Sequence, residues 1–370
     1  MNQPAQDSLI GLTTQEIRAL VSEAAGVPAY RGTQIADRLY RRLLPGQGGG
    51  FGAEWAAMTD LPQETRVALA ARFPALPLTL TRSQEDKGDG TVKALARLVD
   101  GGHPIECVLL PDVRRVSVCL STQAGCPMGC TFCATGTQGL TRNLTAGEIV
   151  AQFLLLQSLS PRRISHVVLM GMGEPLLNYD ATLKAIRVLN AECGVAMRHV
   201  TLSTVGIVPA IEKLMAEDLQ ITLAVSLHAP NDVLRTRLVP VNKTYPLDRL
   251  LPACRDYAKQ TGRRLTFEYV LLRGVNDEPE HARELARLVR ATPAAVNIIP
   301  YNPTSVAEPF GRPEPSRIAA FRRILEDGGV VVTQRKERGR QIAAACGQLV
   351  TETTRRRPSG QSLPVLAGAA

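Results

Sequence analysis

The amino-acid sequence lacks several features that would place the protein in a special class. No apolar run approaches the roughly 18 residues that a membrane-spanning helix needs. The N-terminal stretch MNQPAQDSLIGLTTQE has neither the basic nor the apolar region of a secretory signal, so we expect a cytoplasmic protein. Neither disorder nor repeats are needed to explain a composition of 45% hydrophobic and 21% charged residues. A chain of 370 residues can bury the core of a large domain with a small companion.

Cysteine is present eight times without an export signal, which argues against a disulfide framework and favours metal ligation or redox catalysis. Three of these residues, Cys126, Cys130 and Cys133, lie within the stretch AGCPMGCTFCATG. Their C-x3-C-x2-C spacing lets three thiolates converge from one loop, and thiolates bind iron–sulfur clusters and zinc. The second C-x2-C pair that a structural zinc site usually has is missing. A cubane 4Fe-4S cluster on three cysteines leaves one iron open to bind a substrate or cofactor.

Six apolar runs rich in β-branched residues, separated by helical patterns, begin near residues 116, 166, 199, 221, 264 and 295. Such runs are typical of strands buried on both faces in a parallel sheet. Six βα units in about 200 residues predict an α/β fold, a partial (β/α)6 barrel, because a complete eightfold barrel typically needs about 250 residues. A doubly wound open sheet is the alternative. A seventh strand near residue 330 fits beside either architecture.

Further patterns divide the chain into four units. A capping box from Thr13 to Glu16 and later helical periodicity predict an N-terminal helical unit. Alternating residues around Asp100-Gly101-Gly102 predict a β-hairpin. The predicted units are a helical accessory domain at residues 1–88 and a β-hairpin linker at 89–115. They are followed by the barrel with a C-terminal cysteine loop at 116–350 and a basic, loosely ordered tail at 351–370.

The formal net charge is +9, and from residue 335 onward seven basic residues stand against two acidic ones. This clustering favours a polyanionic partner, nucleic acid in particular, although a solvated surface explains any single cluster equally well. Four arginines also give the predicted N-terminal helices a basic face, which predicts either RNA contact or an ordinary exposed surface: Arg31, Arg38, Arg41 and Arg42.

Polar motifs follow four of the predicted strands: GMGEP at 171–175, LST at 202–204, SLHAPND at 226–232 and PYNP at 300–303. Barrels bind their ligands at the C-terminal ends of strands, so these motifs are expected to surround one site. Glycines in GMGEP allow the backbone to approach a ligand closely. Each motif also has an ordinary structural explanation, but their shared placement favours a common site.

The combination of CLSTQAGCPMGCTFCATGTQGLTRNL, VVLMGMGEPLLN, SLHAPND and RGRQIAAACGQL resembles the RlmN/Cfr family of radical S-adenosylmethionine (SAM) RNA adenine methyltransferases, from about residue 90 to 350. The N-terminal helical unit is also similar to that family's accessory domain. The proline in GMGEP and the SLHAP sequence resemble the RlmN branch, which methylates carbon 2 of adenine, and not the Cfr branch, which methylates carbon 8. The family often has an acidic residue where Arg340-Gln341 stands, which leaves the anchoring of the cysteine loop open.

The resemblance implies one 4Fe-4S cluster on Cys126, Cys130 and Cys133, whose open iron binds SAM. It also implies that seven residues bind SAM, among which Glu174 accepts from its ammonium group. The implied SAM-binding residues are Gly173, Glu174, Ser203, Ser226, Leu227, His228 and Asn302.

The family's mechanism implies roles for three further residues. Carbon 2 of adenine has no acidic hydrogen, so ordinary displacement from SAM cannot methylate it. Two SAM molecules serve each cycle: the first methylates Cys346, and the second yields a 5′-deoxyadenosyl radical that takes hydrogen from that methyl group. Cys119 matches the resolving cysteine, which would form a transient disulfide with Cys346, and Glu106 matches the general base.

The implied partners are 23S rRNA at the peptidyl transferase centre, some tRNAs beside the anticodon, and an electron donor such as flavodoxin. We expect a monomer with no membrane partner. Two alternatives remain open: a carbon 8 methyltransferase, and a non-catalytic iron–sulfur protein that binds RNA.

Overall fold

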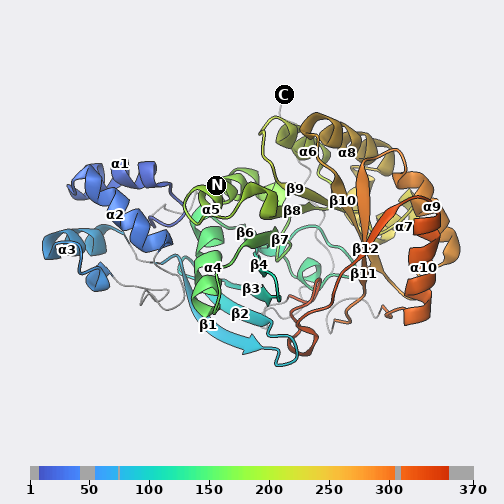
Figure 1. The fold of residues 1–370 in the computed structure, drawn as a ribbon, viewed down its shortest axis with the longest axis horizontal. Coiled ribbons are helices and arrows are strands. Elements are labelled where there is room, and N and C mark those ends of the chain that lie inside the picture. The colour runs from blue at the N-terminus through green and yellow to red at the C-terminus, as the bar shows by residue number, and fades with distance from the viewer. Residues whose placement is uncertain (1–7, 42–54, 74–75, 305–309, 350–370) are drawn as a thin grey trace.

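The computed structural model describes residues 8–41, 55–73, 76–304 and 310–349. The predicted tail, at 351–370, lies outside these residues, as does Arg42. The first helices, α1 (Thr14–Ala25), α2 (Ala29–Tyr40) and α3 (Gln63–Arg72), lie to one side of the main body (Figure 1). The capping box at the start of α1 is confirmed. These helices are joined to the barrel at Thr14, whose backbone and hydroxyl donate to the Glu192 carboxylate at 2.8 and 2.7 Å.

Three antiparallel strands precede the barrel: β1 (Leu78–Glu85), β2 (Val92–Leu98) and β3 (Pro104–Pro111). β3 pairs antiparallel with β4 (Val116–Cys119), the first strand of the barrel. The hairpin of β2 and β3 is confirmed. β1 was not expected, because it lies within the range assigned to the helical unit. It is an edge strand with mostly exposed side chains, so its sequence, LTLTRSQE, lacks the apolar pattern by which a buried strand is recognised.

Seven parallel strands continue the same sheet in chain order from β4. This order confirms the partial barrel and excludes the doubly wound alternative, in which the strand order reverses at a switch point. All six expected strands are present, and the seventh pairs with its predecessor. After β4 they are β7 (His166–Leu169), β8 (Val200–Thr204), β9 (Thr222–Ser226), β10 (Leu265–Leu271), β11 (Ala294–Pro300) and β12 (Val331–Gln334).

Helices between the strands cover the outside of the barrel (Figure 1). The first of them is buried along most of its length, and its expected capping box, Thr145 to Glu148, is confirmed. Among the described helices, none is long and apolar enough to cross a membrane. The covering helices are α4 (Ala146–Leu159), α5 (Tyr179–Ala191), α6 (Val208–Met215), α7 (Asp232–Leu238), α8 (Leu247–Thr261), α9 (Pro279–Val289) and α10 (Pro315–Asp327).

A separate two-stranded sheet, β5 (Gln123–Cys126) and β6 (Gly139–Asn143), follows β4. Single 3-10 turns complete the path of the chain. They are η1 (Trp55–Ala57), η2 (Thr135–Thr137), η3 (Pro175–Asn178), η4 (Met197–His199), η5 (Pro240–Lys243) and η6 (Arg340–Ile342).

Candidate active site

The three clustered cysteines lie at the end of β5 and in the loop between β5 and β6. These strands pair antiparallel, with Cys126 opposite Gly139, so the loop leaves and returns at one place. The thiols of Cys126, Cys130 and Cys133 are free and line a cavity of about 150 Å³, the cysteine cavity. Burial raises the pKa of the Cys126 thiol to about 12 and that of Cys130 well above its usual value. These thiols therefore need a bound cation to lose their protons at neutral pH.

The GMGEP loop after β7 brings Gly173 and Glu174 to the wall of the cysteine cavity. The carboxylate of Glu174 is buried and accepts from the backbone N–H groups of Leu176, at 3.1 Å, and Val205, at 2.8 Å. Burial raises its pKa to about 7. The bond from Val205 connects the loop after β7 to the end of β8, and the local bond from Leu176 helps to hold the carboxylate beside the cavity.

Ser203, Ser226 and His228, at the ends of β8 and β9, line the same cavity. His228 has a φ of +60°, and its Nδ1 accepts from the Val270 N–H at 3.0 Å. That bond leaves the ring proton on Nε2. Burial, and to a smaller extent the charge of Arg235, lowers the pKa of His228 to about 3, so the ring is a neutral donor at physiological pH.

Asn302 and Leu227 are placed differently. Asn302 lines a second, larger cavity, and its side-chain oxygen is buried with no hydrogen-bond partner among the described residues. Such an oxygen indicates a ligand that donates to it. Leu227 is fully buried, lies outside the described lining of both cavities, and donates its backbone N–H to the Glu268 carbonyl at 3.0 Å.

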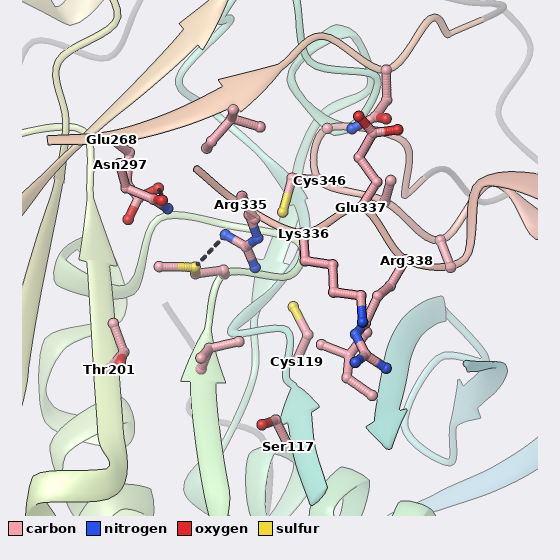
Figure 2. A pocket seen from close by; sticks show the side chains of 18 of the residues that line it. Ser117, Cys119, Thr201, Glu268, Asn297, Arg335, Lys336, Glu337, Arg338 and Cys346 are labelled. Carbon is pink, nitrogen blue, oxygen red and sulfur yellow. Dashed lines mark hydrogen bonds between the residues drawn. The ribbon is translucent and has the colours of Figure 1, made fainter. Parts of the chain in front are cut away.

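The larger cavity has a volume of about 530 Å³ and contains two further cysteines. Figure 2 shows the thiols of Cys119, at the end of β4, and Cys346, in the C-terminal segment, pointing toward one another with the Arg335 guanidinium beside them. Cys346 and Arg335 also line the cysteine cavity, so they stand where the two cavities meet. Burial, and then the neighbouring Cys346, raises the pKa of Cys119 to about 12, against the opposing effect of Arg335.

Glu106 lies on β3, two residues before Val108, which pairs with Cys119. Its carboxylate is buried and forms an ion pair with Lys93, at 3.1 Å, which the sequence does not single out. Glu106 is not among the described residues that line the larger cavity. It therefore lies on the same face of the strand as the cavity but behind its wall.

Comparison with known proteins agrees with this arrangement. A model of the Radical SAM superfamily matches residues 120–286. A curated protein of Thermosynechococcus vestitus, named probable dual-specificity RNA methyltransferase RlmN, is 48% identical over 92% of this chain and 97% of its own length. A protein of the same name from Symbiobacterium thermophilum is 46% identical over 94% and 92%. The chain belongs to the RlmN family. The crystal structure of a radical SAM methyltransferase from Sphaerobacter thermophilus matches with a TM-score of 0.87 and 48% identity, over 92% of this chain and 98% of that chain.

Membership of the RlmN family makes the chain a radical SAM methyltransferase and implies a 4Fe-4S cluster and SAM. Within the described part of the chain, no three His, Cys, Asp or Glu side chains converge closely enough to hold a single metal ion. A cubane cluster offers a different iron to each cysteine, so its ligands surround it and do not meet at one point. Three free thiols around one cavity, with the unpartnered Asn302 oxygen in the adjoining one, fit a cluster and its ligand.

Replacing Gly173 by alanine is expected to weaken SAM binding by at least about tenfold and to destabilise this RlmN-family protein by about 2 kcal/mol. Its φ of +105° disfavours any side chain, and a Cβ atom would lie 2.6 Å from the Cβ of Gln123. Gly262→Ala is the matched control, because Gly262 also has a positive φ, +65°, but open space around it. Equilibrium SAM binding and thermal unfolding of both variants test this. Equal SAM affinity in the two variants would contradict the expectation.

The sequence patterns do not single out two arginines that lie at the site. Arg235, on the short helix α7, is fully buried and donates to the carbonyls of Val205 at 2.7 Å and Ser226 at 3.2 Å, which holds the ends of β8 and β9 together. An arginine on such a helix is usually exposed, so the sequence does not mark it. Arg335 counts in the sequence as one charge of the basic C-terminal cluster, but the structure places it between the cavities. At least one charge of the basic C-terminal cluster therefore lies inside the site and not on an outer surface.

Proposed function

We propose that this enzyme transfers a methyl group to carbon 2 of an adenosine in RNA through a methylated Cys346. The supporting observation is the position of Cys346 between the cavity lined by Cys126, Cys130 and Cys133 and the cavity lined by Cys119. A sulfur in this position borders both the cysteine cavity, where the cofactors would bind, and the larger cavity, where the RNA base would bind. The names of the curated relatives, dual-specificity RNA methyltransferases, supply RNA as the substrate class.

Cys126, Cys130 and Cys133 would hold one 4Fe-4S cluster, which when bound supplies the electron that cleaves SAM to methionine and a 5′-deoxyadenosyl radical. The carboxylate of Glu174 would accept from the SAM ammonium, and Leu227 belongs to the set through the family resemblance. The proposed SAM-binding set is Gly173, Glu174, Ser203, Ser226, Leu227, His228 and Asn302.

Cys346 and Cys119 of the larger cavity, together with Glu106, which does not line it, would carry the methyl transfer. Cys346 accepts a methyl group from one SAM, and this methyl group gives a hydrogen atom to the radical from the second SAM. The methylene radical left on Cys346 then bonds to carbon 2 of the adenine, and the resulting adduct radical loses one electron, for which the oxidised cluster would be the acceptor. Glu106 acts as the base that takes the proton from carbon 2. The Cys119 thiolate attacks the Cys346 sulfur, and an S–S bond forms as the S–C bond breaks. The released carbon takes up a proton to become the methyl group, and an external reductant opens the disulfide before the next cycle.

Product release is expected to accelerate with pH. Burial raises the pKa of Cys119 to about 12, so its thiolate fraction rises about tenfold for each pH unit below that value. Single-turnover assays with prereduced enzyme between about pH 7 and pH 9 should therefore show faster release of methylated RNA at the higher pH. A release rate that does not change over this range would contradict Cys119 as the attacking thiol.

RNA would reach the site as a flipped-out base, at a cost of a few kcal/mol. Arg115, Lys336 and Arg338 line the larger cavity and would contact the phosphates. The proposed targets are an adenosine of the peptidyl transferase centre of 23S rRNA and the adenosine beside the anticodon of some tRNAs. We further propose that the enzyme is a cytoplasmic monomer and that an electron donor such as flavodoxin reduces its cluster.

Nucleoside analysis of 23S rRNA and tRNA from a deletion strain and its complemented derivative tests the proposal. Loss of 2-methyladenosine, restored by complementation, is the expected result. Loss of 8-methyladenosine would instead establish the carbon 8 alternative. Unchanged nucleosides, together with RNA binding by the purified protein, would favour the non-catalytic iron–sulfur protein.

A further inference from the structure

The segment that carries Cys346 has little regular structure of its own: after β12 it forms only the short turn η6. Figure 1 shows this C-terminal segment, in red, beside the cyan β1 and β2. Its backbone is held by the turn between these two strands. The N–H of Gly339 donates to the Asp89 carboxylate at 2.9 Å, and the N–H of Gln341 donates to the Asp86 carboxylate at 3.3 Å. Gly339 packs so closely on the turn that a Cβ atom would lie 2.9 Å from the Thr91 side chain.

Lys93, at the start of β2, makes the third connection. Its ammonium lies 3.1 Å from the Glu106 carboxylate and donates to the Ala343 carbonyl at 3.4 Å. Ala343 has a φ of +49°, a conformation that costs a residue with a side chain free energy and that persists only when its surroundings impose it. Ala343 is three residues before Cys346. One partly buried cation therefore contacts both a buried carboxylate and the strained backbone of the cysteine segment.

We propose that Asp86, Asp89 and Lys93 form a hairpin clamp that positions Cys346, with Lys93 tying the clamp to Glu106. The proposal rests on the proposed function of Cys346 and Glu106. The family often has an acidic residue where Arg340-Gln341 stands. In this protein the acidic groups that anchor the segment come instead from the β1–β2 turn.

The need for such a clamp follows from the position of Cys346. Its sulfur lies where the two cavities meet, and a misplacement of about 1 Å can cost a catalytic group about a hundredfold in rate. On the C-terminal side of Cys346 the segment is held by the Ala134 N–H, which donates to the Gly347 carbonyl at 2.8 Å, and on the N-terminal side it is held by the β1–β2 turn and Lys93. Because Lys93 binds both Glu106 and Ala343, it keeps the proposed base and the methyl-carrying sulfur in a constant relation. All three clamp residues are positioning residues, since they act through Cys346 and Glu106.

Hydrogen–deuterium exchange of the cluster-loaded enzyme tests the clamp directly. Lys93→Met is expected to raise the exchange rate of residues 339–345 by at least about tenfold, since the Ala344 N–H, which donates to the Gly339 carbonyl at 3.0 Å, reports on this turn. Lys93→Arg is expected to restore slow exchange. Arg97→Met is the matched control, because Arg97 lies on the same strand but donates to the Gly102 carbonyl. Unchanged exchange in Lys93→Met would overturn the proposal.

If Lys93→Met fails to fold, Asp89→Ala provides a second test of the clamp. Asp89 is only partly buried, so its replacement should leave the protein folded. We expect faster exchange at Gly339 to Ala345, a fall in kcat of about tenfold and an unchanged KM for SAM. Asp100→Ala is its control, because Asp100 lies in the β2–β3 turn, at the other end of β2. Slow exchange and full activity in Asp89→Ala would overturn the clamp. If the wild type makes no 2-methyladenosine but the exchange differences persist, the proposed function fails while the clamp stands.

Discussion

The Cys346→Ala variant is expected to lose methyl transfer to RNA by more than about 10⁴-fold. Without the sulfur of Cys346 the proposed methyl carrier is gone, because the other thiol among the described residues that line both cavities, Cys133, is a proposed cluster ligand. The remaining groups act on a substrate that displacement chemistry cannot methylate. The same variant should keep about four irons per chain and should still cleave SAM under dithionite, because Cys126, Cys130 and Cys133 lie on a different segment. The result would thus separate generation of the radical from its use.

Transfer of labelled methyl from SAM to RNA, and release of 5′-deoxyadenosine, are the two measurements for this variant. Cys254→Ala is the control, because Cys254 is a buried cysteine of α8 and its truncation should cost only about 1 kcal/mol of stability and little activity. If Cys346→Ala still methylated RNA, the methyl-cysteine mechanism would be wrong. If neither variant nor wild type cleaved SAM, the non-catalytic alternative would gain support.

Replacement of Cys119 by alanine is expected to trap the enzyme on its substrate. The methylene bridge between Cys346 and carbon 2 would form as in the wild type, but no thiol would attack the sulfur to release it. Multiple turnover should therefore fall by more than about 10³-fold, while a covalent protein–RNA adduct accumulates toward one per chain. The removed thiol is buried at the end of β4, so the substitution leaves a small cavity and should preserve the fold.

A denaturing gel reveals the adduct, and mass spectrometry after nuclease digestion should locate an adenosine on Cys346. The double variant lacking both Cys119 and Cys346 should form no adduct, which separates covalent capture from tight binding. Cys107→Ala is a second control, since Cys107 is a fully buried neighbour of Glu106 on β3 and has no proposed role in release. Wild-type turnover by Cys119→Ala, without an adduct, would refute the resolving role.

Strands buried on both faces could be predicted from the sequence because their composition reflects burial alone. The runs at β9 and β11 have this property, and both lie where they were expected. β1 could not be predicted in this way, because an exposed edge strand is selected by pairing with β2 and leaves no apolar pattern. The site shows the same division. Residues in local motifs, such as Gly173, were recognisable, whereas Lys93 and Arg235 act through contacts that no local pattern records.

The sequence by itself determined that three thiols lie in one loop, that parallel strands follow in order, and, through family resemblance, which other residues to examine. Only the tertiary structure decided that Cys119 and Cys346, more than 200 residues apart, share a cavity, and that Lys93 touches both Glu106 and the segment before Cys346. The physical reason is that spacing in the chain sets geometry only over a few residues. Contacts between distant residues depend on the closure of the sheet and on the packing of each segment against it.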